Sequence, residues 1–249
     1  MSIPSEYWLH HMYFYVLLFT IHYINGILVI DRNFKVHYTR KINHLAFFFL
    51  PTLLSLLVVE YPYSAVTFIM DMVCAFIFLT FFIAPLRNRF RLLQLMFCSF
   101  DRPEDRPFTL VWLYTQFIAS YLVLIPLLIY FENHGMLPLL MIIIIVNGIG
   151  DGLAEPIGIR FGKRKYTTYA LFTKEKYVRS YAGSACVFVT AFITILAFHP
   201  YFNAIQLIVA LLTIPILMTL AEAFSPHTWD SPFIYAVGGI SLIGIFLFL

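Results

Sequence analysis

Charge is scarce in this chain. Only 12% of its 249 residues are Asp, Glu, Lys or Arg, whereas 61% are hydrophobic. A soluble domain carries about 25% charged residues, so the composition excludes an ordinary soluble domain. The chain also has only three cysteines, with no CxxC or other paired spacing. Their placement argues against a disulfide framework, a zinc site and thiol catalysis.

Most of the chain consists of long apolar segments. A helix needs about 20 residues to cross a bilayer, and in lipid only helices or closed barrels satisfy the backbone. The blocks lack the alternation that is typical of strands, so we predict an all-α, polytopic membrane bundle that forms one domain over residues 1–249. Eight segments are expected, near residues 12–30, 45–59, 64–86, 108–131, 137–149, 183–198, 203–222 and 232–249. Those near 45–59, 137–149 and 183–198 are short, and they either borrow flanking residues or are broken or re-entrant.

Positive charge is confined to alternate loops. The loops 31–44, 86–107 and 150–182 hold four, five and seven basic residues, which is every Lys and Arg, and the loops near 60–63, 132–136 and 199–202 hold none. Because basic loops stay cytoplasmic, we expect both termini outside and the basic loops inside. This pattern predicts an integral membrane protein, of a bacterial inner membrane or a eukaryotic endomembrane, with its site facing the cytoplasm.

The stretch 147–184 combines acids, glycines and basic residues between two apolar segments. An acid inside a membrane costs about 3 kcal/mol on insertion scales, so Asp151 and Glu155 are functional candidates. Four residues apart, they share one face of a continuous helix and suit Mg²⁺, which takes one or two carboxylates plus substrate phosphates. The alternative is that they neutralise nearby basic residues. Pro156 disfavours helical geometry at Glu155, so a helix break is expected there.

Two further features of this stretch have alternative readings. The glycines allow backbone amides to approach a phosphate, but they also suit close packing of membrane helices. The spacing of these glycines matches neither the nucleotide-binding motif G-x-x-x-x-G-K-[ST] nor a G-x-G-x-x-G motif that follows a strand. The basic triplet Lys163–Lys165 suits a triphosphate, and equally suits membrane topology and lipid headgroups. The glycines are Gly148, Gly150, Gly152, Gly158 and Gly162.

Several motifs resemble one enzyme family. This family is that of the CTP-dependent polyprenol kinases. Its GDG-A-(D/E)--G--FGK block is similar to GDGLAEPIGIRFGKRKY, which begins at Gly150. Its K-S-x-x-GS block is similar to RSYAGS, which begins at Arg179. That family includes phytol, farnesol and dolichol kinases and the yeast-type diacylglycerol kinase, and is related distantly to phosphatidate cytidylyltransferases. Three further segments are similar to segments of this family and occur in the same order. They are RKINH at 40–44, PEDRPF at 103–108 and AEAFSPHTWDSPF at 221–233.

The resemblance implies transfer of a phosphoryl group from CTP, or another nucleoside triphosphate, to a lipid alcohol in the membrane, with Mg²⁺ as cofactor and no nucleic-acid partner. It implies Asp151, Glu155, Glu222 and His44 as catalytic residues, the first two also as metal ligands. The implied nucleotide-binding residues are Lys41, Lys163, Lys165, Arg179, Gly183, Ser184 and Asp230. Arg179 stands where a lysine is usual, and its guanidinium suits the same phosphate. Ser231 follows Asp230 where the family pattern has Asn.

Three alternatives remain open at this point. A cytidylyltransferase would form a CDP-lipid and release pyrophosphate. An ion-coupled transporter would use Asp151 and Glu155 at a broken helix. A catalytically inactive scaffold would retain the motifs without turnover. The sequence leaves open the lipid, the general base and the oligomeric state, and it gives Asp71, inside the third segment, no role.

Overall fold

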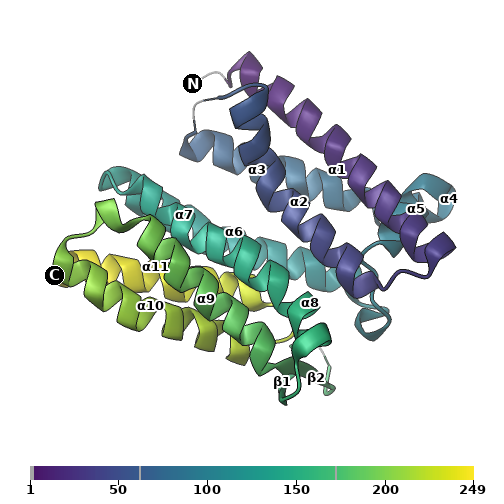
Figure 1. Ribbon diagram of the computed structural model, residues 1–249. Coiled ribbons are helices and arrows are strands. Elements are labelled where there is room, and N and C mark those ends of the chain that lie inside the picture. Colours follow the sequence, from purple (N-terminus) through teal and green to yellow (C-terminus); the bar gives the residue numbers. More distant parts are fainter. Residues whose placement is uncertain (1–2, 62, 172) are drawn as a thin grey trace. The chain divides into compact units, whose positions relative to one another are not determined.

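The computed structural model describes residues 3–61, 63–171 and 173–249 and is mostly helical (Figure 1). It divides into two compact units, Met1–Tyr114 and Thr115–Leu249, whose boundary falls inside helix α6. The first unit contains α1 (Ser5–Arg32), α2 (Val36–Leu57), α3 (Ala65–Thr80), α4 (Ala84–Arg89) and α5 (Arg91–Cys98). After α6 (Thr109–Asn133), the second unit contains α7 (Leu137–Ile145), α8 (Gly152–Phe161), β1 (Lys165–Tyr169), β2 (Lys176–Ser180), α9 (Tyr181–Ala197), α10 (Ala204–Phe224) and α11 (Asp230–Phe248).

Each of the eight predicted apolar segments overlaps a helix, and the segment 64–86 covers α3, a turn and the start of α4. Among the residues that the structure describes, five helical runs are long and apolar enough to cross a membrane, namely Ser5–Arg32, Thr109–Asn133, Leu137–Phe161, Ala204–Phe224 and Asp230–Phe248. Helices α3 and α9 are apolar but shorter. The prediction of an all-α membrane bundle is therefore confirmed at the level of helical content and apolar length.

The run Leu137–Phe161 is one continuous helical rod with an irregular turn in its middle. Residues Val146–Asp151 form a π-helical turn between α7 and α8. The short segment predicted at 137–149 therefore extends into the residues that follow it. This was one of the two expectations for the short segments. Wide turns of this kind often occur at functional sites in helices.

The expected break at Glu155 is wrong. Pro156 lies inside α8, and the helix continues through it to Phe161. The change of hydrogen-bonding pattern comes one turn earlier, in the π-helical turn that ends at Asp151. Since the rod is continuous, Asp151 lies ten residues before its end, which is about 15 Å along a helix axis.

A β-hairpin in the basic loop was not predicted. Strands β1 and β2 pair antiparallel, with Tyr166 opposite Arg179 and Thr168 opposite Tyr177. Successive strand residues point to opposite faces, so these four side chains share one face. That inner face is buried or half-buried, whereas Lys165, Tyr169 and Lys176 on the other face are exposed. The hairpin is thus two-sided, with an inner face that packs on protein.

Candidate functional site

The inner face of the hairpin is fixed to the connection between α10 and α11. The Thr168 hydroxyl donates to the carbonyl oxygen of Ser225 at 2.8 Å. The Tyr177 ring stacks on His227 with centroids 3.7 Å apart and planes 7° apart. The backbone N–H of His227 donates to the carbonyl oxygen of Tyr169 at 2.7 Å. These contacts hold the hairpin against the ends of the last two helices.

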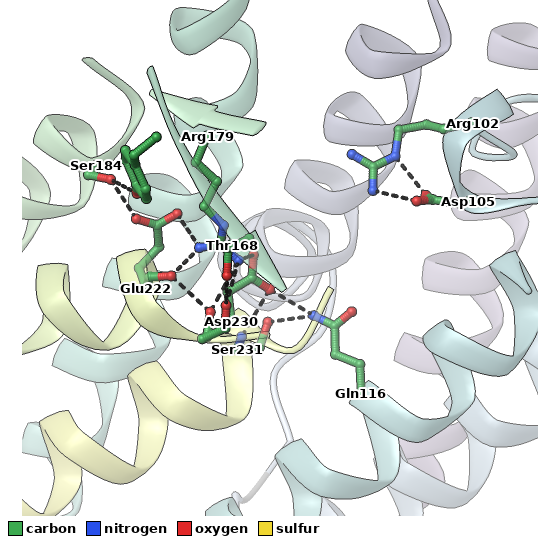
Figure 2. A network of polar contacts seen from close by, with 11 residues as sticks. Arg102, Asp105, Gln116, Thr168, Arg179, Ser184, Glu222, Asp230 and Ser231 are labelled. Atoms are coloured by element: carbon green, nitrogen blue, oxygen red, sulfur yellow. Dashed lines mark hydrogen bonds and ion pairs between the residues drawn. The ribbon is translucent and has the colours of Figure 1, made fainter. Parts of the chain in front are cut away.

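Arg179 reaches from β2 into this end of the second unit (Figure 2). Its Nη1 donates to Glu222 Oε1 at 2.7 Å and also to the Glu222 carbonyl oxygen. Its Nη2 lies 3.2 Å from Ser225 Oγ and 3.8 Å from Asp230 Oδ2. The side chains of Arg179 and Glu222 are only 11% and 6% exposed, so this ion pair is buried.

Three carboxylates set the charge state of Arg179. Burial alone would lower the pKa of Arg179, but the carboxylates of Glu222 and Asp230 outweigh burial and raise that pKa above its usual value. The carboxylate of Asp151 adds to the same effect. Arg179 therefore remains a cation, and Asp151 is close enough to act on it electrostatically.

A hydrogen-bonded chain joins the hairpin to Glu222 through α9. The Ser184 hydroxyl donates to Glu222 Oε2 at 2.8 Å, and the Tyr166 hydroxyl lies 2.6 Å from Ser184 Oγ. Since the single Ser184 proton goes to the carboxylate, Tyr166 is the donor to Ser184. Burial, reinforced by the charge of Glu222, raises the pKa of Tyr166, so its hydroxyl keeps that proton.

Asp230 is held at the start of α11 by a residue that the sequence analysis missed. Gln116 Nε2 donates to Ser231 Oγ at 2.9 Å and to Asp230 Oδ1 at 3.3 Å (Figure 2). An acid at a helix N-terminus is also favoured by the helix dipole. Gln116 could have been noticed as a lone amide inside the apolar helix α6. Ser231, which departs from the family pattern, thus still contributes an oxygen to this contact.

The π-helical turn is anchored beside these residues. Asn147 Nδ2 donates to the Tyr235 hydroxyl at 2.7 Å, and both residues are buried. A Cβ atom added at Gly150 would lie 3.1 Å from the Cα of Val187, so the turn passes close to α9. Asp151, itself buried, is the last residue of this anchored turn.

Gly183 has a packing role in the structure, next to its predicted role at a phosphate. A Cβ atom at Gly183 would lie 2.7 Å from the carbonyl oxygen of Ala154, which belongs to the backbone of α8. We therefore expect Gly183→Ala to push α8 and α9 apart and to lower the free energy of unfolding by about 1–3 kcal/mol.

Gly244→Ala is the matched control for this prediction. A Cβ atom at Gly244, in α11, would meet nothing within 4 Å, and alanine favours a helix over glycine by about 1 kcal/mol. Thermal unfolding in detergent should show a lower midpoint for Gly183→Ala and an unchanged or higher one for Gly244→Ala. Equal midpoints for both variants would contradict the close contact between α8 and α9.

The other predicted site residues are more dispersed. Lys163 and Lys165 are exposed where the chain enters the hairpin, and Glu155 is half-buried on α8. Lys41 and His44 belong to α2 in the first unit, where Lys41 is buried and His44 is half-buried. Within the second unit, the residues that the structure brings together are Asp151, Arg179, Ser184, Glu222 and Asp230.

The charged stretch PEDRPF forms an internally paired turn in the first unit. Arg102 donates to both oxygens of Asp105, at 2.7 and 3.0 Å, and both residues are buried. Arg106 pairs with Asp101 at 2.7 Å, and the Thr109 hydroxyl donates to the same carboxylate. These contacts shape the entry into α6.

The donor set of the second unit suits Mg²⁺ by its chemistry. Asp151 is the residue before α8 and Glu155 lies in its first turn, so the two carboxylates share one face of the rod. Carboxylate oxygens are the ligands that Mg²⁺ prefers in proteins.

The chain matches no family model, no curated protein and no solved structure.

Proposed function

We propose that this chain is a membrane lipid-alcohol kinase that transfers a phosphoryl group from CTP, or another nucleoside triphosphate, to a lipid alcohol. The observation that carries the proposal is the pairing of Glu222 and Asp230 with one buried guanidinium, that of Arg179, on which the charge of Asp151 also acts. Phosphoryl transfer depends mostly on positioning and on charge stabilisation. A buried set of carboxylates beside a basic hairpin supplies both.

Each residue has a distinct part in the proposed reaction. Asp151 and Glu155 would hold Mg²⁺, which when bound would neutralise charge on the phosphate oxygens. Lys163 and Lys165 would contact the phosphates from the hairpin. Arg179 and Ser184 each occupy one oxygen of Glu222, and each carboxylate oxygen has a second lone pair. Glu222 can therefore still accept the proton of a substrate hydroxyl.

The proposed topology puts this chemistry at the cytoplasmic face. Eight crossings with the N-terminus outside would leave all basic loops inside. To test this, single cysteines are introduced as His134→Cys and Lys174→Cys after replacement of Cys74, Cys98 and Cys186. An impermeant thiol reagent added to intact cells should label position 134, and position 174 only after permeabilisation. The opposite pattern would invert the topology.

The enzyme assay is direct. Purified protein is incubated with Mg²⁺, γ-labelled CTP or ATP, and a panel of phytol, farnesol, dolichol and diacylglycerol. A kinase transfers label to a lipid and releases the nucleoside diphosphate. Release of pyrophosphate with a nucleotide-linked lipid would instead identify a cytidylyltransferase. Folded protein that neither transfers label to a lipid nor releases labelled pyrophosphate would overturn both readings.

The second candidate is an ion-coupled transporter. The observation that favours it is the depth of Asp151, which lies ten residues inside a candidate span and is the last residue of a π-helical turn. Acids at irregular turns of membrane helices can bind coupling ions. Solute uptake into liposomes that contain the protein but no nucleotide would support the transporter over the kinase.

A further inference from the structure

A second polar cluster lies in the first unit, where buried residues of α1 meet the half-buried Asp71 of α3, whose side chain is 24% exposed. The Tyr7 hydroxyl donates to Asp71 Oδ1 at 2.9 Å, and His11 Nε2 lies 2.8 Å from the same oxygen. The rings of Tyr7 and His11 stack with centroids 3.9 Å apart. Tyr7 is fully buried and His11 is 7% exposed. An ionisable cluster inside membrane helices is a functional-site candidate by default.

The hydrogen-bonding partners of His11 determine its chemistry. Its Nδ1 lies 2.9 Å from the carbonyl oxygen of Tyr7, one helical turn earlier. A carbonyl oxygen can only accept, so Nδ1 must carry a proton. The same contact recurs at His22, whose Nδ1 faces the carbonyl oxygen of Leu18 at 2.8 Å.

The second ring nitrogen then faces a carboxylate. A neutral imidazole carries one proton, and in His11 the backbone contact already uses it. Nε2 would thus present a lone pair to Asp71 Oδ1, and two acceptors at 2.8 Å repel each other. The contact requires one more proton, either on His11 as an imidazolium or on Asp71 as a carboxylic acid. The proton of Tyr7 does not supply it, because the Tyr7 hydroxyl is the donor in its own bond to Asp71.

We propose that His11 and Asp71 form a proton-binding site. The pair holds one proton more than a neutral histidine beside an ionised carboxylate, and this proton joins α1 to α3. The titratable groups that face the pair are Tyr7, His10 and Tyr15 from α1, Cys74 from α3, and Tyr61 from the segment after α2.

The position of the pair separates it from the phosphate chemistry. His11 lies 21 residues before Arg32, the last residue of α1, which is about 32 Å along a helix. The hydrocarbon core of a bilayer is about 30 Å thick. The pair therefore lies near the membrane face opposite the basic loop that follows α1. A proton site there goes beyond the proposed kinase activity, and neither depends on the other.

Spectroscopy on the folded protein tests this site. Protein labelled with ¹⁵N-histidine, in nanodiscs at pH 7.5, should show one buried imidazolium in the ¹⁵N spectrum, or one protonated carboxyl in the infrared spectrum. Asp71→Asn should abolish the signal. Asp31→Asn, at the opposite end of α1, should retain it, and so should Tyr7→Phe, which keeps the pair.

The wild-type spectra alone can overturn the proposal. If His11 carries a single proton and every buried carboxyl is ionised at pH 7.5, the pair holds no extra proton and the proposal is wrong. If Asp71→Asn does not fold, His11→Gln identifies the signal instead. Persistence of the signal in both folded variants would assign the proton to another group and also reject the site.

Discussion

Asp151→Asn is expected to reduce phosphoryl transfer to lipid by about 10²–10³-fold or more, which is the loss seen when one charge-stabilising group is removed from an active site. The substitution keeps the size of the side chain and removes its charge. Asp151 is buried, ends the anchored π-helical turn, and acts electrostatically on Arg179. If its carboxylate holds Mg²⁺, the variant should also need a higher Mg²⁺ concentration for half-maximal residual activity.

Glu175→Gln is the matched control for this experiment. Glu175 lies between the two strands, in the same unit, and is exposed. Its substitution removes the same charge and should leave turnover unchanged. Both variants should unfold at a temperature close to that of the parent protein. Near-normal turnover of folded Asp151→Asn would remove Asp151 from the proposed mechanism.

The helices could be predicted from the sequence because burial in lipid leaves the backbone few choices. Every apolar segment that composition indicated is mostly helical. The irregular turn Val146–Asp151 could not be predicted in the same way. It differs from an α-helix by one position in its hydrogen bonds, and such a shift leaves no mark on hydropathy. The proline at 156 suggested an irregularity in this rod but indicated the wrong turn.

The hairpin was missed for a different reason. Its strands are five residues long and lie within a basic loop, where charge obscured the alternation of Tyr166 and Thr168 with exposed neighbours. The resemblance to a kinase family did single out Arg179, Ser184, Glu222 and Asp230, which come from separate elements. The pairing of Arg179 with Glu222 joins residues 43 positions apart. It depends on the hairpin folding back onto α10, so no local pattern could reveal it.

The buried pair of Arg179 and Glu222 should dominate the stability of the second unit. Removal of one partner leaves the other charge buried, and this typically costs about 3–5 kcal/mol. We therefore expect Arg179→Met and Glu222→Met each to lower the free energy of unfolding by about that amount. In the double variant no uncompensated charge remains from the pair. Its loss should be smaller than the sum of the single losses by about 1–3 kcal/mol, the coupling typical of contacting residues.

Lys165→Met provides the comparison for this cycle, because Lys165 is an exposed cation on the outer face of the same hairpin. Surface substitutions of this kind usually change stability by less than about 0.5 kcal/mol. Unfolding in mixed detergent and denaturant micelles gives the four free energies of the cycle. Limited proteolysis between β1 and β2 reports whether the hairpin is released, since Arg179 connects it to α10. Strictly additive losses would mean that the two side chains do not interact in the folded protein. A coupling of the expected size, with release of the hairpin in both single variants, would establish Arg179 as the residue that positions Glu222.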